Sequence, residues 1–357
     1  MEKEGLEVAG KKIGKQTIRF VNKPIISGMC SVVGTKEGQG PLKEYFDVIL
    51  QDDMYNEKTW EKAESKMLKE AVMTAAKRSG VSTEEIDVML TGDLLNQLMS
   101  SAFMARDLHI PFIGLYGACS TMTQAMLISG MIVDGNFATN VLAGASSHFC
   151  TAERQFRMPL EHGNQRPPSA QWTATAAGAV CISAAPSENV KNLVPPPKTI
   201  CLTEGTIGKI IDTGMKDANQ MGAAMAPAAV DTLLNHLEDT GRSPDYYDII
   251  LTGDLGFIGK DIAVDLLTDA GLNRGILQNI YDDCGTMIYE KEQDVHSGGS
   301  GCGCSASVYT GWLFRRMRKG EINRALILST GALLSTISPF QGESIPGIAH
   351  AVALETM

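Results

Sequence analysis

One cysteine of this chain stands where a nucleophile could act. Cys119 lies in the stretch LYGACSTMTQAM (residues 115–126), where an apolar segment turns directly into an apolar helical pattern. Gly117 permits a tight turn, so the first N–H groups of the helix would point at the sulfur. A thiol in that place is expected to have a lowered pKa and to act as a nucleophile. A buried, unreactive cysteine is the alternative, and the residues alone leave both open.

Other side chains that could contact a ligand follow predicted strands or lie in glycine-rich turns. Each has a structural alternative, such as a buried histidine with internal partners or a thiol that fills the core. With Cys119, the predicted ligand-binding residues are Ser147 and His148 in GASSHF, Asp283 and Cys284 in IYDDCGTMIY, His296, and Cys302 in GCGC. GCGC lacks the usual Cys-x2-Cys spacing and no second pair of ligands accompanies it, so we predict no metal site and no cofactor.

Composition and charge exclude several classes of function. The chain has 357 residues, 44% of them apolar and 20% charged, which is typical of a globular protein. The net charge of −10 and the dispersed basic residues argue against nucleic acid as a partner. The charged N-terminus predicts no signal peptide, and the longest nearly apolar run, residues 174–185, is too short to span a bilayer. Eight cysteines without a signal peptide indicate a reducing compartment.

The strongest organisational signal is an internal repeat. EIDVMLTGDL (residues 85–94) returns as YYDIILTGDL (residues 246–255), each time as an apolar run typical of a buried parallel strand. Asp93 and Asp254 then stand where a helix N-cap is expected, although a ligand contact is the alternative, more so for Asp254. The proline-rich stretch 186–198 is the expected hinge. We therefore predict a duplicated α/β fold with halves at residues 1–190 and 199–357.

A second repeat involves the cysteines. Cys119 lies 16 residues before Gly135, and Cys304 lies 16 residues before Gly320. Both segments are predicted to form a helix, a glycine turn and an apolar strand. The spacing predicts a second helix start at Cys304 and Ser305 that faces the first.

Three stretches of the chain resemble the thiolase superfamily. They are EAVMTAAKRSGVSTEEIDVML, GACSTMTQAM and AAGAV. The resemblance implies a thiolase-like fold with layers in the order α-β-α-β-α. More narrowly, GASSHFCTAERQFRMPLEHGNQRPPSAQWTATAAGAVCIS and DVHSGGSGCGCSAS resemble the stage V sporulation protein AD family. That resemblance implies binding of dipicolinic acid for uptake into the developing spore. It also implies a homodimer, peripheral association with the inner spore membrane, and other stage V sporulation A membrane proteins as partners.

The chain departs from the superfamily's enzymes at the residues that handle protons. Gly253 aligns with the histidine of the ketosynthase His-Gln-Ala-Asn string, and Cys302 aligns with a later asparagine. The histidine of the thiolase Gly-His-Pro motif aligns with Gly298, and no cysteine follows Cys304. Since acyl transfer depends on such bases and oxyanion donors, we expect a non-catalytic binding protein. The alternative is an acyl- or ketoacyl-transferase that uses Cys119 with His296.

Dipicolinate is a flat pyridine with two carboxylates, so its site needs converging hydrogen-bond donors. We expect the N–H groups of residues 119–121 to bind one carboxylate and the helix start at Cys304 and Ser305 to bind the other. If calcium accompanies the ligand, Asp282 or Asp283 is expected to contact the metal.

Overall fold

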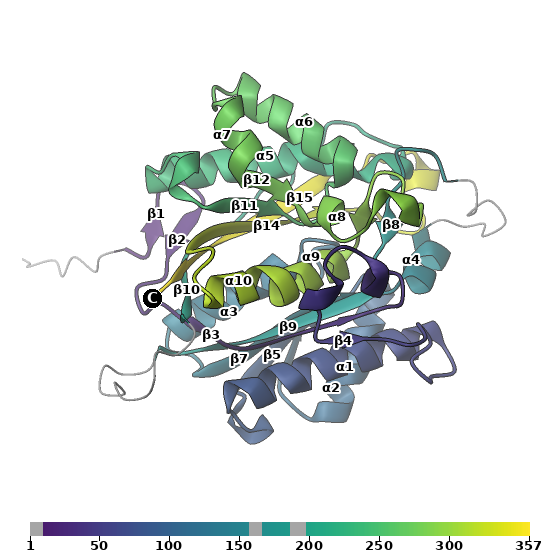
Figure 1. Cartoon of the computed structure of the whole chain (residues 1–357), viewed down its shortest axis with the longest axis vertical. Helices are drawn as coiled ribbons and strands as arrows, with labels where there is room; N and C mark the ends of the chain where they lie inside the picture. The colour runs from purple at the N-terminus through teal and green to yellow at the C-terminus, as the bar shows by residue number, and fades with distance from the viewer. Residues whose placement is uncertain (1–9, 157–165, 186–197) are drawn as a thin grey trace, which may run out of the picture.

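Two half-sheets with the same strand order form the frame of the protein (Figure 1). The computed structural model describes residues 10–156, 166–185 and 198–357. In sheet order, the first half contains β3 (Ile25–Val33), β9 (Ala176–Ser183), β7 (Asn140–Ser147), β5 (Val88–Gly92) and β6 (Phe112–Gly114). The second contains β10 (Ile200–Thr206), β15 (Gly347–Thr356), β14 (Arg324–Ala332), β11 (Ile249–Thr252) and β12 (Tyr281–Asp283).

The matching strand orders confirm the predicted duplication. Strand β5 runs parallel to β6 and β7, and β11 runs parallel to β12 and β14. The Thr-Gly-Asp repeats therefore end equivalent strands of the two halves. The half-sheets meet where β10 pairs with β3 through Cys201 and Ile25. Buried on both faces, these strands carry the continuous apolar runs that such positions select.

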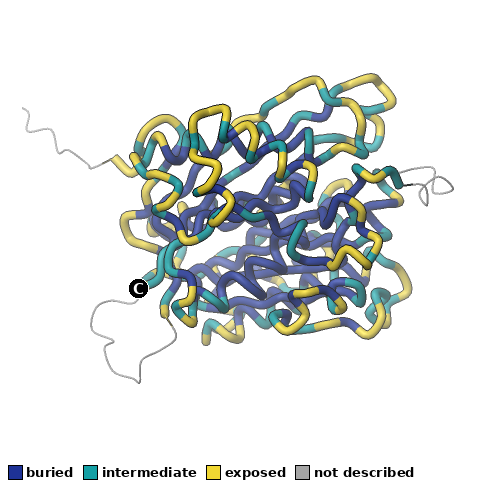
Figure 2. The backbone as a smooth tube through the Cα atoms, turned by 45° about the horizontal axis from the view of Figure 1, so that its top comes forward, coloured by how far each residue is buried: buried dark blue, intermediate teal, exposed yellow. Residues whose placement is uncertain are grey.

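Helices fill three layers around and between the half-sheets, which confirms the predicted α-β-α-β-α order (Figure 1). One outer layer contains α1 (Trp60–Ser79) and α2 (Met99–Leu108). The other contains α5 (Met221–Thr240), α6 (Gly256–Asp269) and α7 (Arg274–Ile280). The central layer contains α3 (Thr121–Asp134), α9 (Cys302–Val308), the π-helical turn Tyr309–Leu313 and α10 (Phe314–Arg318). Figure 2 shows this centre as almost continuously buried.

Short elements complete the frame near the site. They are α4 (Phe149–Phe156), β8 (Trp172–Thr173), α8 (Cys284–Met287) and β13 (Gly299–Ser300), with β4 (Val48–Ile49) beside β3. At the N-terminal end, β1 (Lys12–Ile13) pairs with β2 (Thr17–Arg19), and β2 pairs with β10 of the second half. Of the predicted hinge 186–198, residues 186–197 lie outside the described residues. In the ranges that the structure describes, no helix combines the length and apolarity needed to cross a bilayer.

Asp93 is not the N-cap residue of α2, which is Leu98, but its carboxylate accepts hydrogen bonds from the segment before the helix and from its first turn. The carboxylate accepts from Leu95 N at 2.9 Å and from Ser101 N, in the first turn of α2, at 2.7 Å. These two bonds satisfy amides that the helix itself leaves without partners. Asp254, the matching residue of the second half, is placed quite differently.

Candidate functional site

Cys119 lies in a strained turn between β6 and α3. Ala118 has a φ of 49°, a left-handed conformation that costs a non-glycine residue about 1–2 kcal/mol. The turn is closed by hydrogen bonds from Ser120 N to Gly117 O (3.0 Å) and from Thr121 N to Ala118 O (3.3 Å). Cys119 is 6% exposed. The turn thus delivers the thiol to the start of α3, as the sequence predicts.

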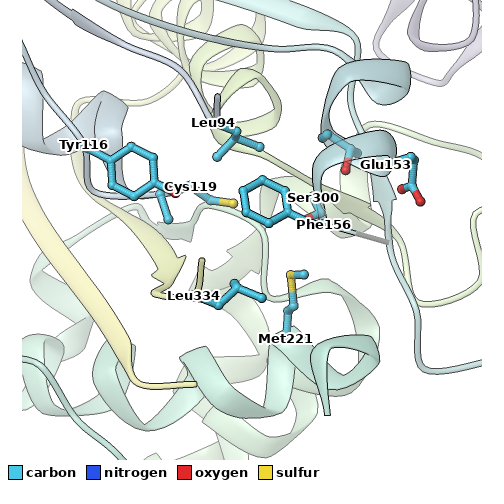
Figure 3. Close-up of a pocket in the computed structure, with 12 residues that line it drawn as sticks. Leu94, Tyr116, Cys119, Glu153, Phe156, Met221, Ser300 and Leu334 are labelled. Carbon is cyan, nitrogen blue, oxygen red and sulfur yellow. The ribbon is translucent and has the colours of Figure 1, made fainter. Parts of the chain in front are cut away.

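A cavity of about 30 Å³ opens beside the Cys119 sulfur. In Figure 3 the Phe156 ring points at this sulfur, with Leu94 on one side and Met221 and Leu334 on the other. The lining consists of Leu94, Tyr116, Ala118, Cys119, Ala152, Glu153, Phe156, Thr173, Met221, Ser300, Ala332 and Leu334. A space of this size holds about two water molecules, so a larger ligand requires side chains such as Phe156 to move.

The polar groups of the cavity are hydroxyls and one carboxylate. Tyr116, Thr173 and Ser300 contribute hydroxyls, Glu153 contributes the carboxylate, and the lining includes no lysine, arginine or histidine among the described residues. Thr173 and Ser300 are directly paired in the β8–β13 ladder. A cavity of this composition suits an uncharged, largely apolar ligand with hydrogen-bonding groups better than it suits a free dianion.

Asp254 is the acidic group that faces Cys119. The Cys119 thiol hydrogen-bonds to its carboxylate, which also accepts from Gly301 N (2.9 Å), Ser300 Oγ (3.2 Å) and Thr330 Oγ1 (2.9 Å). Burial raises the pKa of Asp254 to about 7, and the nearby charge of Asp283 adds to the increase against the lowering effect of the hydrogen bonds. Near neutral pH this carboxyl group therefore carries a proton part of the time.

The expectation of a lowered pKa for Cys119 is wrong. Burial raises the thiol pKa well above its ordinary value, and the charge of Asp254 raises it further, while a hydrogen bond from Gly301 N opposes the increase only in part. The positive end of α3 does not overcome these two effects. Cys119 is consequently a protonated thiol, which is a weak nucleophile.

Asp283 makes the hydrogen bonds at the start of α6 that the sequence leads us to expect from Asp254. Asp283, predicted to contact a ligand, accepts from Leu255 N, Gly256 N and Gly285 N at 2.8, 2.9 and 2.9 Å. It also accepts from Thr252 Oγ1 at 2.8 Å, and burial raises its pKa to about 6. Asp283 thus anchors the start of α6, the task expected of Asp254. Its role as a ligand contact stays a prediction, but its oxygens are used inside the protein.

Three predicted residues, Ser147, His148 and Cys302, do not line the cavity. Ser147 Oγ donates to Ala174 O at 2.7 Å and accepts from Gly303 N at 3.1 Å. His148 Nε2 lies 3.0 Å from Asp53 O, and burial lowers its pKa. Cys302 donates to Ser146 O at 2.8 Å and is fully buried. All three are buried and linked to the backbone.

Cys284 and His296 also lie outside the lining. Cys284 is fully buried, and that burial raises its pKa well above the ordinary value. His296 Nδ1 lies 2.8 Å from Pro167 O, and its Nε2 lies 3.1 Å from the carboxylate of Asp294. Of the seven predicted ligand-binding residues, only Cys119 lines the cavity.

At the second predicted carboxylate site, the Cys304 N–H donates to Gly301 O at 2.9 Å. Helix α9 begins at Cys302, two residues before the expected start. The Gly301 N–H donates to Asp254 and the Gly303 N–H donates to Ser147. On the α3 side, the N–H groups of Ser120 and Thr121 bond to carbonyls of their own turn. These amides therefore already have acceptors inside the protein.

Sequence reasoning missed most of the lining, because distant loops supply it. Met221 starts α5, Leu334 follows β14, and Phe156 ends α4. The sequence signal for Tyr116 is its place three residues before Cys119, in LYGACSTMTQAM. The signal for Asp254 is its place after the Thr-Gly repeat, where the sequence allows a ligand contact as an alternative to a helix cap. Among the described residues, no group of three or more histidine, cysteine or acidic side chains could hold a metal ion.

Comparison with known proteins gives one family match and one sequence relative. The family model described as stage V sporulation protein AD matches residues 14–355. Stage V sporulation protein AD of Bacillus subtilis (strain 168) is 43% identical over 345 residues, which cover 97% of this chain and 98% of that protein.

The solved structures that match are thiolase-like enzymes at low sequence identity. A variant of OleA from Xanthomonas campestris matches with a TM-score of 0.60 at 12% identity, over 96% of this chain and 98% of that chain. The 3-oxoacyl-[acyl-carrier-protein] synthase III of Aquifex aeolicus matches with a TM-score of 0.56 at 13% identity, over 93% of this chain and 99% of that chain. Human mitochondrial 3-ketoacyl-CoA thiolase matches with a TM-score of 0.55 at 14% identity, over 94% of this chain and 99% of that chain. These similarities confirm the predicted fold.

Proposed function

The chain belongs to the stage V sporulation protein AD family, and on this basis we propose that it binds dipicolinic acid, as the calcium chelate, for uptake into the developing spore without catalysing acyl transfer. The ligand comes from the family resemblance in the sequence. The binding place and the absence of catalysis are argued from the cavity beside Cys119.

Two features together carry the proposal. A cavity lies beside Cys119, and the group next to the thiol is an acid, not a base. The thiolase-like turn still presents Cys119 to an apolar space, but the group that touches the thiol is the carboxylate of Asp254. Acyl transfer by a cysteine needs a thiolate, and a neighbouring acid opposes its formation. The arrangement supports binding and disfavours covalent chemistry.

The composition of the cavity favours the chelate over the free acid's dianion. One calcium ion neutralises the two carboxylates of dipicolinate, so the complex enters without net charge. The apolar lining can then cover the pyridine ring, while the hydroxyls of Tyr116 and Thr173 donate to carboxylate oxygens. The calcium remains bound to its own ligand, since the described residues offer no dedicated metal site.

Isothermal titration with calcium dipicolinate tests this proposal. We expect saturable binding to the wild type and an affinity lower by about tenfold in Thr173→Val, which keeps the size but removes a hydroxyl. Thr139→Val, at an exposed position, is the matched control and should bind like the wild type. Absence of binding, or equal affinity in Thr173→Val, would overturn the assignment to this cavity.

The rival function, acyl transfer by Cys119, is tested by the intact mass of the protein after incubation with acyl-CoA. We expect no mass increase. A stable acyl adduct that disappears in Cys119→Ala would establish an active nucleophile and replace the proposal.

We further propose that the protein works as a homodimer beside membrane partners of the stage V sporulation A group. The supporting feature is β6, which pairs with β5 only and leaves its other edge open among the described residues. Ile113 on this edge is 46% exposed. Sedimentation equilibrium is expected to give twice the chain mass, and Ile113→Lys should shift it toward the monomer. A wild-type monomer at micromolar concentration would contradict the dimer.

A further inference from the structure

Two side chains that close the cavity, Leu94 and Phe156, are joined through the amide of Gln155. Gln155 Nε2 donates to Leu94 O at 3.0 Å, and its Oε1 accepts from Asn96 N at 3.1 Å. Leu94 lies in the segment between β5 and α2, whereas Gln155 precedes Phe156 at the end of α4. One amide therefore ties together the two segments whose side chains lie beside the Cys119 sulfur (Figure 3).

The cavity is too small for an organic ring while these side chains are in place. Its volume of about 30 Å³ holds about two water molecules. The facing wall belongs to the second half of the chain, where Met221 begins α5 and Leu334 follows β14. Entry of a ligand with a ring therefore requires one of the two walls to move.

The segment between β5 and α2 has a strained backbone. Gln97 and Leu98 have φ angles of 57° and 54°, so two successive residues occupy the left-handed region that residues other than glycine rarely adopt. Asp93 holds the start of the segment through Leu95 N at 2.9 Å, and Leu98 N donates to Leu95 O at 3.0 Å. The Gln155 amide holds the segment against α4, so its release allows the strained residues to relax.

Open space lies on the other side of the two joined segments. The lining of a second cavity, of about 330 Å³, includes Leu95, Asn96, Gln97, Thr151, Arg154 and Gln155. The last three have the spacing of one face of α4, whereas Ala152 and Phe156 of the same helix line the Cys119 cavity. The joined segments thus separate a closed cavity from a space into which they can move.

The first turn of α4 is anchored to α1, so the helix can pivot about that end. Thr151 Oγ1 donates to Glu64 Oε2 at 2.9 Å, and both residues are buried. Arg154 pairs with Glu61 of α1, but its side chain is 47% exposed, and ion pairs at the surface contribute little to stability. Release of the Gln155 amide therefore loosens the end of the helix that carries the cavity-lining ring.

From this geometry we propose that Gln155 is a positioning residue for ligand entry, which makes Leu94 and Phe156 a single lid that opens as a unit toward the second cavity. In the closed lid both hydrogen bonds of the amide are made, and the cavity admits only water. In the open lid both are broken, the strained backbone relaxes, and the two side chains leave the space beside Cys119 together. The proposal rests on the proposed function for the identity of the ligand, whereas the lid is measured without that ligand.

Labelling of Cys119 by N-ethylmaleimide in the full chain measures how often the lid opens, because the reagent does not fit into the closed cavity. We expect Gln155→Ala to label about tenfold faster than the wild type, since two hydrogen bonds of the closed lid are lost. Gln155→Glu keeps the size and the acceptor for Asn96 N but cannot donate to Leu94 O, so its rate should lie between the two. Gln278→Ala, which removes an exposed glutamine from α7, should label like the wild type.

Cys181 serves as the internal control, because it is fully buried in β9 and reacts only when the fold opens. Peptide mass spectrometry reads both cysteines in one digest, and the rate at Cys181 should be equal in Gln155→Ala and the wild type. An unchanged rate at Cys119, an equal acceleration at Cys181, or a Gln155→Glu rate equal to that of the wild type would overturn the proposal. Failure of the proposed function is distinguishable, because calcium dipicolinate then does not bind the wild type while Gln155→Ala still accelerates the labelling of Cys119.

Discussion

The carboxylate of Asp254 accepts a hydrogen bond from the thiol of Cys119, beside a cavity of about 30 Å³ that Cys119 lines. Besides burial, the charge of Asp254 and its hydrogen bond with the thiol both raise the pKa of Cys119, whereas the same hydrogen bond lowers the pKa of Asp254. In this turn, Cys119 would be a nucleophile beside a histidine. Beside Asp254 it stays protonated.

Removal of the Asp254 charge should make Cys119 more reactive. In Asp254→Asn the amide still accepts from Gly301 N, and the thiol pKa falls because the neighbouring charge is gone. We expect alkylation of Cys119 by iodoacetamide at pH 8 to accelerate by about tenfold, measured by peptide mass spectrometry. Asp261→Asn, which removes an exposed charge on α6, is the control. An unchanged rate would show that burial alone protects the thiol.

Stability should fall as the pH rises from about 6.5 to 8, because below this range His148, His236 and His350, whose pKa values burial lowers, oppose the effect of the buried acids. Burial raises the folded-state pKa of Glu37 to about 7, of Glu64 to about 8, of Asp254 to about 7 and of Asp283 to about 6. An acid with a raised folded pKa contributes stability that is complete below its unfolded pKa and is lost as the pH passes the folded value. The slope reaches about 1.4 kcal/mol per pH unit for each proton released.

Urea unfolding at a series of pH values measures this slope. We expect Asp254→Asn to flatten the curve between pH 5 and 7, because one of the titrating groups has been removed. A wild-type stability that increases steadily from pH 6.5 to pH 8 would contradict the burial of protonated acids.

The two aspartates that satisfy helix amides should differ in their contribution to stability. Asp283 accepts four hydrogen bonds in the core, three of them from backbone N–H groups, whereas Asp93 accepts two from the backbone. We expect Asp283→Ala to cost about 3–5 kcal/mol and Asp93→Ala about 1–3 kcal/mol. Urea unfolding of both variants gives the comparison, and Asp283→Asn, which keeps an acceptor, should lose less than Asp283→Ala. The reverse order for Asp93 and Asp283 would refute the anchoring role.

The Phe156 ring should control entry to the cavity. It points at the Cys119 sulfur and fills space that a bound pyridine ring would need (Figure 3). We expect Phe156→Ala to bind calcium dipicolinate several-fold faster in stopped-flow mixing, because no large side chain has to move first. Phe340→Ala, which alters a ring that is 80% exposed, should leave the rate unchanged. An association rate that is equal in Phe156→Ala and wild type would exclude this gating.

The architecture was predictable from the sequence because it depends on local patterns. Continuous apolar runs mark strands buried on both faces, and their repetition around Thr91 and Thr252 revealed the duplication. The glycine turn and apolar helix pattern likewise placed Cys119 correctly.

The chemistry of the site was not predictable, because it depends on contacts between distant residues. Asp254 and Asp283 both follow buried strands and precede helices, so the same local pattern fits either role. Asp254 contacts Gly301, Thr330 and Cys119, whereas Asp283 contacts the start of α6. These contacts decide the role of each aspartate. Burial, which is a property of the whole fold, then reverses the pKa expected for Cys119.

The most direct test of the central claim is a crystal structure of the protein with calcium dipicolinate. The account predicts the pyridine ring between Leu94 and Leu334, with Phe156 displaced, Thr173 in contact with a carboxylate, and an unmodified Cys119. A ligand bound elsewhere, with the space beside Cys119 unchanged, would contradict it.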